Sequence, residues 1–428
     1  MTIMFITFAF VLLIGAPIYV AIGGCGFLPL VLKILPLSPN VVPQATLDGM
    51  SNPLLVAIAL FFISGALMQA SGLADEILSF ADAAVGHVYG GVGTATIVAS
   101  AFFATLTGSA LAGTIAIGTI TVSGMITRGF PRPLAGAVAA SGGALGALIP
   151  PSNPMIIYGV LSATSIGALF TAGIVPGLMV TATLAIVMIL IGKKNNLIDQ
   201  NKKFNLIYLF KTTWRCKWSL IAPFIILGSI YSGLCTPTEA AEIAVFYAMF
   251  YGFIIKRTLK FSTFFRAFRD GAVTASVMLV MAGVAGGFGR IITMYQLPQT
   301  VGKAIAVIST DPHIVLLMIL IFLLFTGCFM ETMSQVIILT PIFLPILTQL
   351  GVSPVMFGVL FVLMIEIGFL TPPVGGNLFV AVKLTGSSIM SISKAELPFI
   401  GCYLLWAVIY IFFPELVLWF PRLLGYTV

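Results

Sequence analysis

Two proline pairs interrupt long apolar runs of this sequence, and they constrain the fold more than any other feature. Pro150 and Pro151 follow the residues GALI, and Pro372 and Pro373 follow GFLT. A proline lacks the backbone donor and clashes with the carbonyl four residues earlier, so each pair is predicted to break a helix. Carbonyls freed within a bilayer are costly unless they face a protein cavity or a ligand. Each break therefore predicts a buried polar site.

The composition places these breaks in a membrane. Of the 428 residues, 60% are hydrophobic and 8% are charged, whereas soluble domains have about 25% charged residues. We predict an all-α polytopic membrane protein with roughly ten spans of about 20 residues. The first apolar run lacks a basic leader and a small-residue cleavage site, so we expect a retained span. The five cysteines show neither disulfide nor metal-site spacing, and we expect them to be apolar filler.

Basic residues set the predicted orientation. Seven Lys and Arg fall within 193–217 and five within 256–269, so both loops are predicted to be cytoplasmic. The net charge of +7 is thus a topology signal and not a nucleic-acid signal. Arg128 and Arg132 are placed on the same side, so the apolar segment 93–127 must return to the side it started from as a re-entrant hairpin. The alternative, two plain spans, requires an extra crossing elsewhere.

A displacement of 222 residues relates the two halves of the chain. It carries LIPPSNP onto LTPPVGG, Gly129 onto Gly351 and Pro176 onto Pro398, and it brings TLTGSA close to LFTGCFME. Each half then has five crossings, and an odd number inverts the second half relative to the first. Inverted repeats whose broken helices meet at mid-membrane are typical of secondary transporters.

The predicted domains follow from this repeat. The first repeat covers 1–192, a basic cytoplasmic loop covers 193–217, and the second repeat covers 218–428. The predicted hairpins lie at about 93–127 and 312–352, and the predicted broken helices lie at about 134–163 and 354–385.

Four motifs resemble the large membrane subunit of TRAP transporters, the tripartite ATP-independent periplasmic family. They are ATLTGSALA at 104–112, LIPPSNPMIIYG at 148–159, GSIYSGLCTPTEAAEIAVFYA at 228–248 and FLTPPVGGNLFVA at 369–381. The resemblance covers nearly the whole chain. It implies Na+-driven uptake of an organic acid by an elevator mechanism, with a fold like that of the ion transporter superfamily. It also implies a small four-helix membrane subunit, a periplasmic substrate-binding protein and a multi-pass location in the bacterial inner membrane.

Oxygen atoms gather at both predicted breaks. Backbone carbonyls with Ser, Thr and Asn oxygens suit a hard cation such as Na+, and the half-helix that restarts after each break favours an anion at its N-terminus. We therefore expect at least two Na+ ions. The first cation site is predicted to comprise Thr107, Gly108, Ser109, Gly146, Pro150, Ser152 and Asn153, and the second Thr326, Gly327, Thr332, Thr371, Pro372, Gly375 and Asn377. The predicted substrate contacts are Ser109, Asn153, Glu331 and Asn377.

Each of these assignments has an alternative. A hydroxyl can simply cap its own helix, and Glu331 can lie at the outer interface instead of in a buried site. Glu239 in TPTEAAE is predicted to be an N-terminal helix cap. Arg290 and Glu366, two rare charges in apolar runs, are predicted to pair.

Other function classes lack their sequence signatures. The chain has no G-x-x-x-x-G-K-[ST] phosphate loop for an ATP-driven pump. It has no H-E-x-x-H for an intramembrane metalloprotease, and the repeat argues against a Ser-His protease, so we predict that the chain is not an enzyme. The alternative function is a proton-coupled organic anion transporter of related fold that acts without a binding protein. The substrate stays open between sialic acid and C4-dicarboxylates.

Overall fold

The computed structural model describes residues 6–7, 10–11, 18–31, 38, 40–197 and 203–428. Within this part the chain is helical throughout and contains no strand. Seven helices are long and apolar enough to cross a bilayer, and an eighth span results if α3 (Val41–Met50) and α4 (Leu54–Ala70), bent by 56°, are one crossing. This is a multi-pass membrane protein. The sequence-based figure of roughly ten spans is higher because several apolar helices are shorter than this length. The predicted first span falls mostly outside the described residues.

The first half of the chain contains both short and long helices. Apolar residues dominate them, and glycine or proline stands at several of their ends. After α3 and α4 the elements are α5 (Leu73–Val85), α6 (Gly91–Thr107), α7 (Ala110–Thr127), α8 (Arg132–Leu148), α9 (Asn153–Ser162) and α10 (Ile166–Lys194), with α2 (Ile18–Val31) before them.

The second half begins with α11 (Leu206–Arg215), which connects the two halves. The predicted cap at the start of α13 is present: the Glu239 carboxylate accepts from the Thr236 backbone at 2.7 Å, and the Glu239 backbone donates to the Thr236 hydroxyl. The remaining elements are α12 (Lys217–Tyr231), α13 (Pro237–Phe250), η1 (Tyr251–Ile255), α14 (Phe261–Met294), α15 (Leu297–Ala306), α16 (Pro312–Gly327), α17 (Thr332–Gln349), α18 (Pro354–Phe369), α19 (Gly376–Thr385), α20 (Ile389–Phe412) and α21 (Glu415–Leu423).

Two helix pairs have tight tips, and two helices are interrupted at the proline pairs. Gly108 and Ser109 alone connect α6 to α7, whereas residues 328–331 connect α16 to α17. Residues 149–152 separate α8 from α9, and residues 370–375 separate α18 from α19. Both proline pairs contain a cis peptide bond. The starts of α7 and α17, and those of α8 and α18, are each 222 residues apart, which is the displacement found in the sequence.

The two halves pack into one another. The half-helix α9 packs against α17 and α18, and the half-helix α19 packs against α7 and α8. Tyr158 of α9 is fully buried, and its hydroxyl donates to the Pro354 carbonyl at 2.7 Å. Its ring lies edge-on to Phe357 and Phe361, with centroids 6.1 Å apart in each pair. Each broken helix is therefore completed by the other half of the chain.

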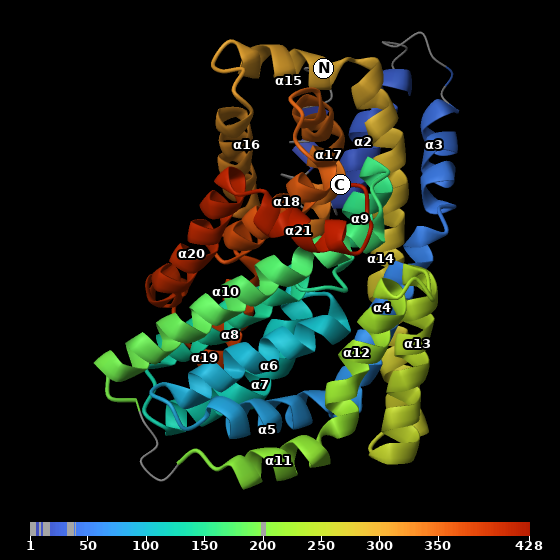
Figure 1. Cartoon of the computed structure of the whole chain (residues 1–428). Helices are drawn as coiled ribbons and strands as arrows, with labels where there is room; N and C mark the ends of the chain where they lie inside the picture. The colour runs from blue at the N-terminus through green and yellow to red at the C-terminus, as the bar shows by residue number, and fades with distance from the viewer. Residues whose placement is uncertain (1–5, 8–9, 12–17, 32–37, 39, 198–202) are drawn as a thin grey trace.

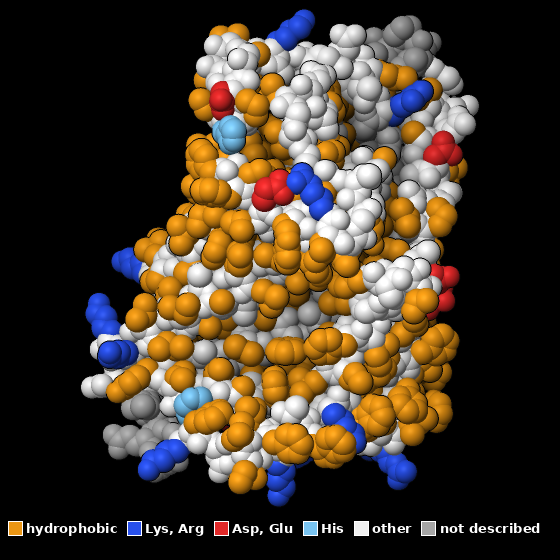
Figure 2. Space-filling model, viewed as in Figure 1, with side chains coloured by type: hydrophobic (Ala, Val, Ile, Leu, Met, Phe, Trp, Pro, Cys, Tyr) orange, Lys and Arg blue, Asp and Glu red, His pale blue; other side chains and the backbone are white. Residues whose placement is uncertain are grey.

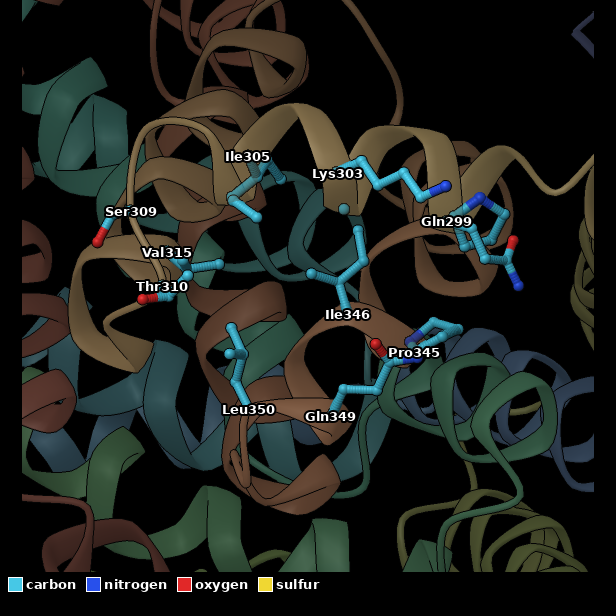
Figure 3. Close-up of a pocket in the computed structure, with 13 residues that line it drawn as sticks. Gln299, Lys303, Ile305, Ser309, Thr310, Val315, Pro345, Ile346, Gln349 and Leu350 are labelled. Atoms are coloured by element: carbon cyan, nitrogen blue, oxygen red, sulfur yellow. The ribbon is translucent and has the colours of Figure 1, made fainter.

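Short helices occupy opposite ends of the molecule, with α5 and α11 at one end and α15 at the other (Figure 1). At the first end, Glu76 of α5 forms an ion pair with Lys256 at 2.5 Å and accepts a hydrogen bond from Ser219 of α12. At the other end, a cavity of about 330 Å³ lies between α15 and α17, and its lining residues include Lys303 on α15 and Gln349 on α17 (Figure 3). The ion pair and the hydrogen bond thus fix α5, the helix that leads into the first hairpin. The helix α15, which leads into the second hairpin, is packed less closely.

Candidate ion and substrate site

The first hairpin tip is hydrogen-bonded to the first helix break. The backbone N–H of Asn153 donates to the Gly108 carbonyl at 3.1 Å, and its side-chain Nδ2 donates to the Thr107 carbonyl at 3.3 Å. Gly108 has a φ of +61°, and a Cβ there would lie 2.5 Å from the Pro151 carbonyl oxygen. Only glycine allows the tip to approach this closely. The Asn153 Oδ1 atom is buried and, among the described residues, has no hydrogen-bond partner.

The serine hydroxyls of the first site cap their own helices. Ser109 Oγ accepts from the Ala112 backbone at 3.5 Å, and Ser152 Oγ accepts from the Met155 backbone at 3.3 Å. This is the alternative considered for each hydroxyl. The same caps direct the N-termini of α7 and α9 toward the tip, where their partial positive charges favour an anion.

The first break is closed off from the protein surface. Ser152 is 0% exposed and Asn153 1% exposed, and Pro150 and Pro151 are also buried. A Cβ on Gly146 would lie 2.6 Å from the Ser109 carbonyl oxygen, so α8 is in close contact with the tip. The structure therefore brings together all seven residues predicted for the first site.

The second hairpin tip contacts the second break through backbone atoms. The Val374 N–H donates to the Cys328 carbonyl at 3.0 Å. A Cβ on Gly327 would lie 2.9 Å from the Cα of Gly368, so α16 and α18 touch at two glycines. Unlike the first break, this one is partly open: Val374 is 41% exposed.

Carboxylates line the second site. Thr332 Oγ1 donates to Glu366 Oε1 at 3.0 Å, and Glu366 Oε2 is buried without a partner among the described residues. The predicted pairing of Arg290 with Glu366 is wrong, because Glu366 is buried against Thr332 whereas Arg290 is exposed on α14. Glu331 is partly buried, and its carboxylate caps α17 by accepting from the Ser334 backbone at 3.1 Å.

The other predicted residues of the second site are less tightly joined. Thr371 Oγ1 donates to the Ile367 carbonyl of α18, the helix that precedes the break, at 2.7 Å. Gly375 has a φ of +51° and starts α19. Asn377 is 0% exposed, and neither atom of its amide has a hydrogen-bond partner among the described residues. A buried amide without hydrogen-bond partners is costly in free energy, which distinguishes Asn377 from the other residues of this site.

Sequence reasoning missed two buried polar groups. Gln335 of α17 accepts from Thr326 Oγ1 at 2.7 Å, beside the second tip. Glu396 of α20 is fully buried and accepts from Ser141 of α8 at 3.2 Å. The available signal was an ionisable or amide side chain within an apolar run, which is rare in membrane helices.

Known proteins share this arrangement. A model of the family described as "Tripartite ATP-independent periplasmic transporter, DctM component" matches residues 5–416. The chain belongs to this TRAP family. It is a large membrane subunit, as the sequence resemblance predicted.

Several TRAP permeases are similar over most of the chain. The isethionate TRAP permease DctMQ of Oleidesulfovibrio alaskensis is 38% identical over 96% of this chain, which spans 65% of that relative. The C4-dicarboxylate large permease DctM of Pseudomonas aeruginosa is 36% identical, over 92% of this chain and 93% of its own length. The sialic acid large permease SiaM of Vibrio cholerae is 35% identical, over 90% of this chain and 91% of its own length. These relatives are permeases and not enzymes.

A solved structure has a related fold. The YdaH transporter of Alcanivorax borkumensis superimposes with a TM-score of 0.65 over 88% of each chain, at 16% sequence identity. At this identity the likeness concerns the fold alone.

Proposed function

We propose that this TRAP subunit moves an organic acid across the bacterial inner membrane together with Na+. The observation that carries the proposal is the contact of the first hairpin tip with the first break. There the Pro151 carbonyl and the unpartnered Asn153 Oδ1 lie beside the Thr107 and Gly108 carbonyls. Neutral oxygens around a hard cation are the expected ligands of Na+. The second site, with Asn377 and Glu366, holds the second ion.

The transport step is proposed to be an elevator movement of the two hairpins and the two broken helices. Support comes from the 222-residue displacement that relates α7 to α17 and α8 to α18. Each half-helix also packs on the hairpin of the other half. Elements interlocked in this way move as one body. The helices that lead into the hairpins lie at opposite ends: α5 is held by the Glu76 ion pair, and α15, which is less closely packed, would flex.

The substrate and partners follow from the family. The relatives are named for isethionate, C4-dicarboxylates and sialic acid, and we propose an organic acid of the sialic acid or C4-dicarboxylate class for this chain. A small four-helix membrane subunit and a periplasmic binding protein complete the transporter, and the binding protein delivers the acid.

The test is uptake by the complete three-component system in proteoliposomes. We expect saturable uptake of the acid that requires the binding protein and an inward Na+ gradient. Uptake driven by a proton gradient, without the binding protein, would instead establish the alternative function. Robust uptake by this chain alone would also count against the tripartite proposal.

The two sites are tested separately with asparagine variants. Asn153→Ala and Asn377→Ala each remove one amide from a buried site, at a cost of about 1–3 kcal/mol. This corresponds to a loss of about 5-fold to 150-fold in apparent Na+ affinity. Asn195→Ala is the control, because Asn195 is exposed at the end of α10. If the apparent Na+ affinity changes in one variant only, that variant marks the single ion site, and the other helix break serves as a hinge. If the apparent Na+ affinity changes in neither variant and uptake is normal, both helix breaks are structural bends.

A further inference from the structure

The helix α11 connects the two halves of the chain and has an exposed apolar face. Ile207, Phe210 and Trp214 follow one another at helical spacing, and they are 81%, 71% and 65% exposed. Leu206 at the start of the helix is 68% exposed. Large apolar side chains are seldom grouped on a water-exposed helix, so a further component covers this face.

Basic side chains border the same face. Lys211 and Arg215 are one turn apart on α11, and both are exposed. Lys217 follows the helix, and its Nζ lies 4.2 Å from the centroid of the Trp214 ring. The helix itself contains no acidic residue. Basic residues beside Trp, Phe and Ile are the composition of helices that lie in a membrane interface.

The position of α11 also favours a lipid surface. The long apolar helix α10 precedes it and the apolar helix α12 follows it, so the helix is held at the boundary of the bilayer. In Figure 2, hydrophobic and basic side chains adjoin at the end that carries α11, and the acidic side chains visible in this view lie away from that end. By the charge rule this end is cytoplasmic, and the cytoplasmic leaflet attracts basic segments through its acidic lipids.

The opposite face of α11 packs against the helix that leads into the first hairpin. Thr212 is buried there, and α11 contacts α5. Phe204, just before α11, packs against His87 at the end of α5, with ring centroids 5.1 Å apart. Movement of α11 into or out of the membrane surface is therefore transmitted to α5.

We infer that the Ile207–Phe210–Trp214 face of α11, with Lys211 and Arg215, binds acidic phospholipid headgroups of the cytoplasmic leaflet and thereby holds α5 in place. A basic residue near an anionic leaflet contributes a factor of about five to binding. The apolar side chains insert between the headgroups, and the two cations contact the phosphates. A protein partner would instead need acidic groups to match Lys211 and Arg215.

The helix α21 supplies a matched control. It is also short and amphipathic, and its Trp419 is 54% exposed. Its one basic residue, Arg422, is paired with Glu415 at 2.5 Å. The two helices thus have similar aromatic exposure, but only α11 has unbalanced positive charge.

The experiment measures fluorescence quenching by brominated lipids. Full-length chains that retain either Trp214 or Trp419 as their single tryptophan, the others replaced by Phe, are placed in phosphatidylcholine vesicles with a minority of phosphatidylglycerol. We expect brominated phosphatidylglycerol to quench Trp214 about twofold more than brominated phosphatidylcholine at equal content, and K211Q/R215Q to abolish this excess. Trp419 should not distinguish the two lipids.

Two results would overturn the inference. Equal quenching of Trp214 by the two lipids would show that α11 does not select acidic headgroups. Absence of quenching by either lipid would show that the face does not contact lipid and that water or a second copy of the chain covers it instead. If the tryptophan variants fail to fold, the wild-type chain is used: phosphatidylglycerol should raise its melting temperature, and this gain should be lost in K211Q/R215Q. An equal gain in that variant would also overturn it.

Discussion

The two helix breaks have the same backbone plan but different chemistry. At the first, residues 149–152 are buried beneath a two-residue hairpin tip, and only neutral oxygens face the contact. At the second, residues 370–375 lie beside a four-residue tip, Val374 is 41% exposed, and Glu366 brings a carboxylate. The first break is a closed neutral site, and the second is a partly open acidic site.

The difference in charge between the two sites is also present in the residues that cap the second helix of each hairpin. Ser109 and Glu331 are 222 residues apart, and each caps the second helix of its hairpin. A neutral cap leaves the helix dipole free to attract an anion, whereas a carboxylate cap neutralises it and can bind a cation. The two tips thus have their caps at corresponding positions but differ in electrostatics. We expect the first tip to tolerate less change in shape, and the second less change in charge.

The largest effect is expected at Gly108. Gly108→Ala places a Cβ 2.5 Å from the Pro151 carbonyl and adds strain at a φ of +61°. The tip must then separate from the break, and uptake should fall by at least about 100-fold, the rate change that corresponds to about 3 kcal/mol. The matched control is Gly129→Ala, where φ is +85° but no atom lies within 4 Å of the added Cβ. Equal losses in the two variants would show that backbone strain, and not tip contact, is responsible.

A smaller effect is expected from the charge at the second site. Glu366→Gln keeps the size of the side chain and its contact with Thr332 but removes the negative charge. Charged hydrogen-bonding groups contribute about 1.5–3 kcal/mol, so the apparent Na+ affinity should fall by about 10-fold or more. Na+ titration of uptake measures this, with the exposed Glu415→Gln on α21 as control. An unchanged titration would remove Glu366 from the ion site.

The two caps should contribute differently to the stability of the protein. Glu331 accepts from the Ser334 backbone at 3.1 Å and from its hydroxyl at 3.2 Å, whereas Ser109 accepts one bond at 3.5 Å. Loss of a cap lowers the free energy of unfolding by about 0.5–2 kcal/mol. We expect a loss near the upper end of this range for Glu331→Ala and near the lower end for Ser109→Ala. Thermal unfolding of the purified protein measures the difference. The reverse order would mean that hydrogen bonding does not dominate at these caps.

The smallest effect concerns the helices that lead into the hairpins. Burial opposes ionisation of Glu76, but hydrogen bonds, first that from Lys256, outweigh it and hold the pKa of Glu76 below its ordinary value of 4.5. A lowered folded-state pKa stabilises the fold above pH 4.5, and this contribution is lost as the pH falls through the folded-state pKa.

Glu76→Gln should therefore lower the stability by about 1 kcal/mol at neutral pH, the usual net value of a hydrogen bond. The deficit should shrink as the pH falls below 4.5. Thermal unfolding across this pH range measures it. The exposed Lys303→Gln on α15 is the comparison in the second half, and it should show no such dependence. A deficit at neutral pH that persists in acid would mean that Glu76 acts through packing and not through its charge.

Prediction from sequence succeeded where a local backbone rule applies. A proline pair is expected to break a helix, and Pro150 and Pro372 do lie in the gaps between helices. The TRAP family was also predicted correctly, because four motifs occur together over the whole chain. The sidedness of the hairpins, the bound ions and the elevator movement stay predictions.

The site was harder to predict because its partners are distant in sequence. The bond between Asn153 and Thr107 spans 46 residues, and that between Ser141 and Glu396 spans 255. No local pattern fixes which carbonyl an amide will meet. The predicted pairing of Arg290 with Glu366 was wrong for this reason: both are rare charges, but helix packing places one at the surface and the other in the core.

The sequence by itself determined that the chain is a helical membrane protein whose apolar runs are broken at two proline pairs. Proline chemistry, apolar length and charge distribution act locally, so they can be read without coordinates. Only the tertiary structure decided that the first break is closed and neutral while the second is partly open and acidic. That difference depends on which side chains of one half fill the space left by the other, and close packing between distant segments is fixed by the whole fold.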